Sequence, residues 1–227
     1  ERVLAQQLEV DRTSLRSAIR TLISMNLVRS VQGSGITVLA YRENGELNFS
    51  ERLCQIEELE MSQEWIRAAF EFKLTSVPAY LHAIPEVLKS PQREEVLQLV
   101  DQQFSQAKAG ASPPKLATIE VQLQKLLAGI NGNPFVMLHT NTMHNLNIKL
   151  MTILYESVNP QSYLTEQKEI FSGYMLGKTN AQEMEVSLLT LFKRHEKIVN
   201  KKIDELPVKA RLIRSPLRHK PNILTLA

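Results

Sequence analysis

The sequence contains few of the residues that mark disulfide-linked, β-rich or membrane-spanning chains. Cys54 is the single cysteine among 227 residues, which excludes an internal disulfide and a zinc cluster built on several cysteines. Glycine occurs 8 times and aromatic residues make up 6%, so we expect helices rather than a β-rich fold. No stretch of 18 apolar residues is present to cross a membrane. We expect a cytoplasmic protein without a membrane partner.

Charge is spread unevenly along this chain of net charge +3. Residues 1–40 carry five arginines against three acidic residues, a net charge of +2. Residues 207–227 carry five basic and no acidic side chains, a net charge of +5, which leaves −4 for the residues between. Two basic ends favour an anionic partner, although a solvated basic surface would give the same pattern.

The first forty residues have the pattern of a small DNA-binding domain. A short helix is expected over 2–8, and Asp11 is a good N-cap for a second helix over 12–25. Two β-branched runs, 27–31 and 36–39, flank a glycine-rich turn and predict a hairpin. Helix, turn, helix and hairpin in this order predict a winged helix-turn-helix.

The rest of the chain is predicted to be almost entirely helical. The spacing of apolar residues predicts seven amphipathic helices, at about 50–60, 62–83, 92–109, 114–131, 134–156, 162–176 and 180–205. The fold class is therefore mainly α, a winged helix-turn-helix followed by an all-helical bundle. The expected divisions are a DNA-binding domain, a polar linker, a helical domain and a basic tail, at 1–40, 41–49, 50–206 and 207–227.

The motifs of the N-terminal segment resemble those of the GntR family of bacterial transcription regulators. They are Glu1–Ala5, Val10–Arg16, Leu27-Val28 and Gln32–Gly35. The resemblance covers about forty residues with its spacing intact. It implies a DNA-binding regulator that is not an enzyme, and a further helix and short strand upstream of Glu1.

The recognition helix of such a domain enters the major groove with its N-terminal residues. Arginine reads guanine there, whereas hydroxyl groups and backbone amides bind phosphate, and glycines let the wing approach the DNA backbone. The resemblance adds one arginine from the preceding helix. The expected DNA-binding residues are Arg2, Arg12, Thr13, Ser14, Arg16, Gln32, Gly33, Ser34 and Gly35. The expected partner of the homodimer is a pseudo-palindromic double-stranded operator.

The helical part resembles the effector-binding domain of the FadR branch of the same family. The matching segments are Gln63–Glu71, Ile119–Leu127, Asn131–Pro134 and Glu166–Gly177. Many members of that branch hold a metal ion through aspartate and histidines. Here the corresponding positions are Glu120, Gln124, Gln167 and about Leu189. Because glutamine amides are poor ligands for zinc-like ions, we expect no metal and no cofactor.

The resemblance places a small-molecule effector among these helices. The expected effector-binding residues are Arg67, Glu120, Gln124, Met143 and Gln167. Methionine adapts to long apolar ligands, and the metal-free FadR subgroup responds to fatty acyl-CoA, so we expect such an effector, which weakens DNA binding. The alternative is a small carboxylate metabolite held by Arg67.

Two other classes of protein are considered. An enzyme or a metal-binding sensor needs paired ionisable residues or a full ligand set, and the sequence shows neither. A winged-helix protein with a purely structural helical domain stays open, and a ligand-induced change in DNA affinity would exclude it.

Overall fold

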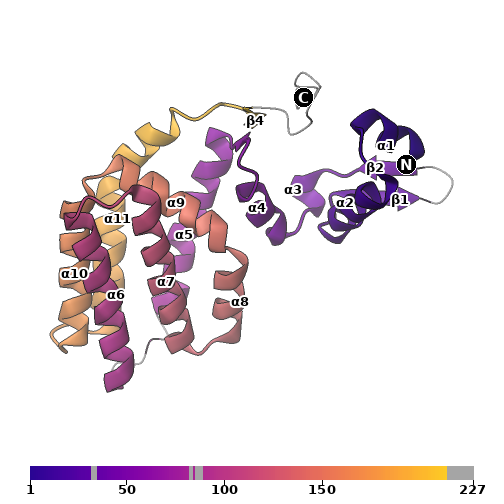
Figure 1. Ribbon diagram of the computed structural model, residues 1–227. Helices are drawn as coiled ribbons and strands as arrows, with labels where there is room; N and C mark the ends of the chain where they lie inside the picture. Colours follow the sequence, from indigo (N-terminus) through magenta and orange to yellow (C-terminus); the bar gives the residue numbers. More distant parts are fainter. Residues whose placement is uncertain (32–34, 82–83, 85–88, 214–227) are drawn as a thin grey trace.

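The computed structural model describes residues 1–31, 35–81, 84 and 89–213 of the chain (Figure 1). The fold is mainly α, as the sequence predicts. A winged helix-turn-helix stands at one end and a helical bundle at the other, with two short helices between them. Within the described residues, no helix is long and apolar enough to cross a membrane.

The winged helix consists of two helices and a hairpin, α1 (Arg2–Leu8), α2 (Arg12–Ser24), β1 (Val28–Val31) and β2 (Gly35–Val38). Its core is small, because Ala5, Leu15 and Ile19 are buried and Leu8 and Ile36 pack against them. The strands pair antiparallel, with Val28 opposite Val38. The predicted helices and hairpin are confirmed.

The segment after the wing differs from the expected linker at 41–49 and helix at 50–60. It forms α3 (Tyr41–Asn44) and α4 (Leu47–Cys54), followed by a short strand, β3 (Leu59–Glu60). The segment is mostly polar, but it contains an aromatic contact between the two helices. The ring centroids of Tyr41 and Phe49 lie 5.7 Å apart. The linker is thus structured, and the first expected helix begins and ends earlier than predicted.

The bundle contains the remaining helices, and α7 lies among them, packed against α5, α6, α8 and α9. Their bounds are α5 (Gln63–Leu81), α6 (Ser90–Lys108), α7 (Pro113–Asn131), α8 (Pro134–Thr142), α9 (His144–Ser157), α10 (Pro160–Met175) and α11 (Ala181–Ile203). Two large apolar clusters fill the interior, one around α9 and one between α6, α7 and α10. Five of the seven predicted helices correspond to α5, α6, α7, α10 and α11.

The helix expected over 134–156 is two helices, α8 and α9, which meet at Met143. The carboxylate of Glu51, from α4, accepts hydrogen bonds from the backbone N–H groups of Asn145 (2.9 Å) and Leu146 (3.1 Å). A side chain from another helix thus satisfies the N–H groups that would otherwise bond to the preceding turn. Sequence periodicity could not reveal this break, because Glu51 lies 94 residues before Asn145.

The beginning of the expected basic tail is part of the fold. Residues Arg211–Leu212 form β4, which pairs antiparallel with β3, and Arg211 forms an ion pair with Glu60 at 2.6 Å. The side chain of Gln63 donates hydrogen bonds to the carbonyl oxygens of Asp204 and Leu206. The ordered chain therefore extends beyond the predicted boundary at residue 206.

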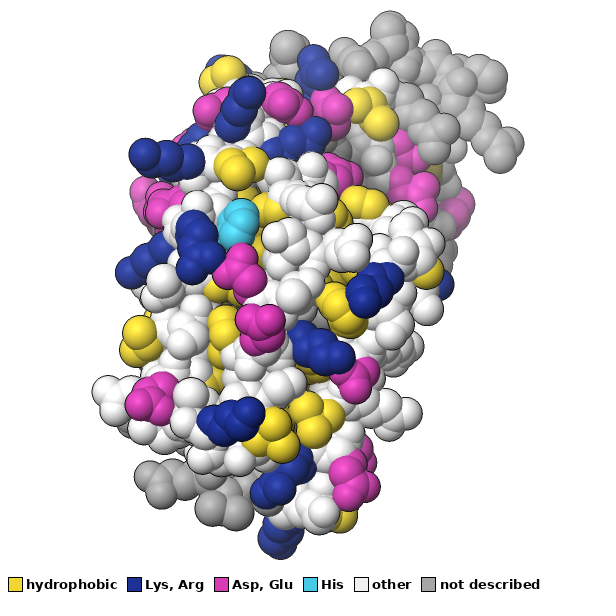
Figure 2. Space-filling model, turned by 90° about the vertical axis from the view of Figure 1, so that its left-hand side faces the viewer, with side chains coloured by type: hydrophobic (Ala, Val, Ile, Leu, Met, Phe, Trp, Pro, Cys, Tyr) yellow, Lys and Arg dark blue, Asp and Glu magenta, His cyan; other side chains and the backbone are white. Residues whose placement is uncertain are grey.

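Charges of both signs are mixed on the face of the bundle formed around α6, α10 and α11. Figure 2 shows Lys and Arg side chains interspersed with Asp and Glu there, with scattered hydrophobic side chains between them. Ion pairs such as Arg194 with Glu166 and Lys168 with Asp101 join α10 to its neighbours. A surface of mixed sign does not attract polyanionic DNA as a continuous basic surface would.

Candidate DNA-binding and ligand-binding sites

Asp11 fixes the start of helix α2, as predicted. Its Oδ1 atom accepts hydrogen bonds from the backbone N–H groups of Thr13 (2.9 Å) and Ser14 (2.8 Å). The side-chain and backbone hydrogen bonds from Ser14 lower the pKa of the Asp11 carboxyl group. The first turn is therefore held by its own cap, in which the Ser14 hydroxyl group takes part, and the side chains of Arg12 and Thr13 are exposed.

The four expected recognition residues of α2 are all exposed and lie within its first five positions. They are Arg12, Thr13, Ser14 and Arg16. Buried Leu15 lies between them and turns toward the core, so the others point outward. Arg16 forms an ion pair with Glu1 at 2.8 Å, and both side chains are well exposed. Such a pair contributes little to stability, so DNA can displace Glu1 at small cost.

The hairpin has the form of a wing. Its strands end at the pair Val31 and Gly35, and Gly35 has a φ of 98°, a conformation that strains other residues. Arg2 is exposed on α1. Gln32, Gly33 and Ser34, the other expected wing residues, lie outside the described residues. The structure thus presents one arginine of α1, the start of α2 and the base of the wing.

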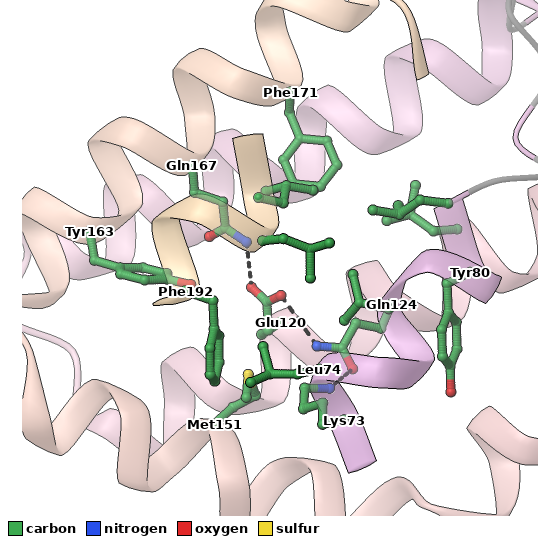
Figure 3. Close-up of a pocket in the computed structure, with 15 residues that line it drawn as sticks. Lys73, Leu74, Tyr80, Glu120, Gln124, Met151, Tyr163, Gln167, Phe171 and Phe192 are labelled. Carbon is green, nitrogen blue, oxygen red and sulfur yellow. Dashed lines mark hydrogen bonds between the residues drawn. The ribbon is translucent and has the colours of Figure 1, made fainter. Parts of the chain in front are cut away.

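A cavity of about 100 Å³ lies inside the helical bundle (Figure 3). Side chains of α5, α7, α9, α10 and α11 surround it. Most of its wall is apolar, formed by Leu74, Val77, Leu81, Leu127, Met151, Phe171, Leu188, Leu189 and Phe192. The polar part comes from Lys73, Tyr80, Glu120, Gln124, Tyr163 and Gln167. A mostly apolar wall with a few grouped polar side chains is typical of a small-molecule site.

Glu120 is the buried acid of this cavity, only 8% exposed. Its Oε2 atom accepts hydrogen bonds from Gln103 (3.1 Å), Tyr155 (3.1 Å) and Gln167 (3.0 Å). Its Oε1 atom accepts one from Gln124 at 3.3 Å. Four neutral donors thus stabilise a buried carboxylate, which would be costly without them. Burial, and after it the same carboxylate, raise the pKa of Tyr155, so this tyrosine stays a donor.

Lys73 is the cation of the same cavity. Its Nζ atom donates hydrogen bonds to Oε1 of Gln124 (3.1 Å) and Oδ1 of Asn147 (3.0 Å). Burial lowers its pKa to about 8, and the nearby Glu120 carboxylate opposes this shift. Since Gln124 accepts from Lys73 and donates to Glu120, it stands between the two charges (Figure 3). The cavity therefore has a positive and a negative end joined by an amide.

The structure brings three of the five expected effector residues together and places the other two elsewhere. Glu120, Gln124 and Gln167 line the cavity. Arg67 does not, because it bonds to Asn200 (2.7 Å) and Asp204 (2.9 Å) where α5 meets α11. Met143 lies at the break between α8 and α9, buried in the core rather than on the cavity wall.

The important residue that sequence reasoning missed is Lys73. Arg67 and Lys73 are six positions apart on α5, so they lie on different sides of the helix. A signal was present, because Lys73 interrupts an apolar row with the spacing of one helix face, formed by Ile66, Phe70, Val77 and Leu81. A single lysine in such a row indicates a buried charge with a specific partner.

The residues of the cavity do not fit the metal ion held by many members of the FadR branch. Only Glu120 offers a carboxylate, and four donors already engage it. The Lys73 ammonium at the other end of the cavity would repel a cation. Across the described residues, no group of three His, Cys, Asp or Glu side chains comes together to bind a metal.

Comparison with known proteins supports the nature of the N-terminal domain. Residues 1–38 match the family model described as bacterial regulatory proteins, gntR family. These residues contain α1, α2 and the hairpin, so the winged helix-turn-helix is the part of the chain that is similar to this family. Among curated proteins, none matches the sequence significantly.

Two solved structures are similar over most of the chain. A GntR protein of Streptococcus agalactiae is 19% identical, with 85% of each chain covered and a TM-score of 0.46. McbR/YncC of E. coli is 15% identical, with 88% of this chain and 85% of that chain covered and a TM-score of 0.45. With both TM-scores below 0.5, the assignment of residues 1–38 depends on the family match and on the geometry of the winged helix.

Proposed function

We propose that this protein is a ligand-responsive transcription regulator that binds double-stranded operator DNA as a homodimer in the cytoplasm. The observation that carries the proposal is the start of α2, where Arg12, Thr13, Ser14 and Arg16 stand exposed on a turn that Asp11 holds in place. Arginines at this position suit base edges, and hydroxyl groups suit phosphates. The proposal involves no catalytic residue and no metal.

The helical bundle, in this proposal, is the effector domain of a FadR-type regulator. The support is the cavity, where an apolar wall meets Lys73, Glu120, Gln124 and Gln167. A half-buried ammonium group with a hydrogen to spare is a natural anchor for a carboxylate. Ligand binding here is expected to change the affinity of the winged helix for DNA.

The cavity favours the small carboxylate over the fatty acyl-CoA that we expected from the sequence. A cavity of about 150 Å³ holds a molecule of the size of benzene. This cavity measures about 100 Å³, and charged and amide groups line one side of it. A long acyl chain would need several times this space. We therefore propose a small carboxylate effector, anchored by Lys73 in place of Arg67.

Selection of DNA from a random double-stranded library tests the DNA-binding half of the proposal. We expect enrichment of an inverted repeat, and the double variant Arg12→Ala/Arg16→Ala should enrich no motif at the same salt concentration. Fluorescence anisotropy with the enriched DNA then measures the effect of short carboxylates and of acyl-CoA. Failure of the folded wild-type protein to enrich any sequence would contradict the proposal.

A further inference from the structure

The polar groups of the cavity have unused hydrogen-bonding capacity. Gln167 is only 6% exposed, and its buried Oε1 atom has no hydrogen-bond partner among the described residues. Figure 3 shows its amide nitrogen directed at Glu120 and its oxygen on the side of Tyr163. A buried acceptor left unpaired is unfavourable, so this oxygen is an expected contact for a ligand donor.

Lys73 and Glu120 each also have one hydrogen-bonding position without a partner among the described residues. An ammonium group has three hydrogens to donate. Within the described residues, the ammonium group of Lys73 donates to two acceptors, Gln124 and Asn147. Oε2 of Glu120 already accepts three hydrogen bonds, whereas Oε1 accepts only that from Gln124 within the described residues, which leaves one lone pair of Oε1 for a ligand. One donor is thus left at the positive end of the cavity, and two acceptor atoms are left at the negative end.

The ligand must respect the charge balance of this cavity. Lys73 and Glu120 together are neutral, so a bound monoanion would leave a net negative charge among apolar side chains, and a monocation would leave a positive one. An uncompensated buried charge is strongly unfavourable. A ligand that carries both signs keeps the balance and uses both ends.

We propose that the cavity binds a small zwitterionic amino acid, with its carboxylate on Lys73 and its ammonium group at the negative end of the cavity, which Glu120 and Gln167 form. This inference rests on the proposed function, which it deepens by naming the ligand class. The apolar wall of Leu and Phe side chains takes the short aliphatic part of the ligand. The small cavity, about 100 Å³, favours a ligand of the size of alanine or 2-aminobutyrate over a larger one.

Isothermal titration calorimetry with three matched sets of compounds tests the ligand class on the full-length protein. The amino acids are alanine, 2-aminobutyrate and valine. The acids that lack the amine are propionate, butyrate and isovalerate, and the amines that lack the carboxylate are ethylamine, propylamine and isobutylamine. We expect at least one amino acid to bind tenfold or more tightly than both its acid and its amine at pH 7.

Three variants assign the contacts. Gln167→Met should reduce the preference of the protein for the amino acid over its acid, and Lys73→Met should abolish binding of both. Arg67→Met removes a cation of the same helix outside the cavity and should bind like the wild type. Circular dichroism shows whether each variant is folded. If a cavity variant does not fold, the compound series on the wild-type protein still tests the ligand class.

The outcomes separate this inference from the proposed function. Binding of an acid or an amine as tightly as its amino acid, or binding of no compound in the series, would overturn the zwitterion. Each of these leaves selection of an operator intact. Absence of operator binding with normal amino acid binding would instead overturn the regulator and leave the ligand assignment standing.

Discussion

Arg12 and Arg16 lie one helical turn apart on the exposed side of α2, and each can reach the edge of a base. Replacing either with alanine should weaken operator binding by roughly 1–3 kcal/mol, which corresponds to about a tenfold to hundredfold loss of affinity. The fold should persist, because neither side chain contributes to the small core around Leu15. Fluorescence anisotropy at fixed salt concentration measures the loss.

Arg194→Ala serves as the control for these variants. This arginine is also exposed and ion-paired, to Glu166, but it lies on α11 in the mixed-charge face of the bundle. We expect it to leave operator affinity unchanged. Wild-type affinity in both Arg12→Ala and Arg16→Ala would contradict the assignment of α2 as the recognition helix.

Lys73 gives the protein a pH-dependent stability of predictable sign. Its pKa is about 8 in the fold, compared with 10.5 for an exposed lysine. Between these values the unfolded chain binds more protons, so the contribution of Lys73 to the free energy of unfolding rises with pH, by at most about 1.4 kcal/mol per pH unit. Below pH 8 the buried ammonium group costs stability.

Urea unfolding of the wild type and of Lys73→Met at pH 7, 8, 9 and 10 checks this sign. From pH 8 upward, the free energy of unfolding of the wild type should rise relative to that of Lys73→Met. The groups that act on Lys73 are Glu120 and His139, and the lowered pKa of His139 places its titration below this range. Buried Tyr155 and Tyr163, with raised pKa values, are present in both proteins, so their effect cancels. A constant difference across this range would contradict a lowered pKa for Lys73.

At the scale of elements, α4 connects the winged helix to the bundle through its polar side chains. The side chain of Asn26, just after α2, donates a hydrogen bond to Glu46 at 3.0 Å, immediately before α4 begins. Further along, Glu51 of α4 caps α9, and α9 carries Asn147 and Met151, which contact Lys73 and the cavity respectively. The cap therefore supports the helix that orients the ligand anchor.

Removal of this cap should loosen the start of α9. Glu51→Ala is expected to cost about 1–2 kcal/mol of stability, as loss of a good N-cap does. Hydrogen exchange should speed up most at the backbone amides of Asn145 and Leu146, which lose their acceptor. Glu57→Ala, at an exposed position just after α4, is the matched control. Unchanged exchange at those two amides would show that the cap does not hold the helix.

At the scale of the whole molecule, one winged helix offers too few base contacts for a specific operator. A two-fold dimer doubles the contacts and requires an inverted repeat. We expect light scattering to show two chains per operator duplex. Moving the half-sites apart by about five base pairs, half a helical turn, should reduce the affinity by at least tenfold, whereas a ten-base-pair insertion should reduce it less. Tight binding of a single half-site by a monomer would contradict this prediction.

Local patterns in the sequence were enough to predict the winged helix and most helices of the bundle. The cap at Asp11, the apolar spacing of α2 and the β-branched runs of the hairpin are interactions between near neighbours, so a single sequence displays them. The same is true of α10 and α11, where Asn159 and Asn180 cap the first turns. The positions of Glu120, Gln124 and Gln167 came from a resemblance to a family, and all three line the cavity.

Only the tertiary structure decided which cation faces that cavity and where the helices break. Arg67 and Lys73 belong to one helix, and their surroundings are set by residues more than fifty positions away, Asn200 and Asp204 for the first and Gln124 and Asn147 for the second. The division of α8 from α9 likewise depends on Glu51. Contacts between distant segments leave no periodic signal in the chain, so the charge pattern of the ligand site, and hence its chemistry, emerges only when the helices pack.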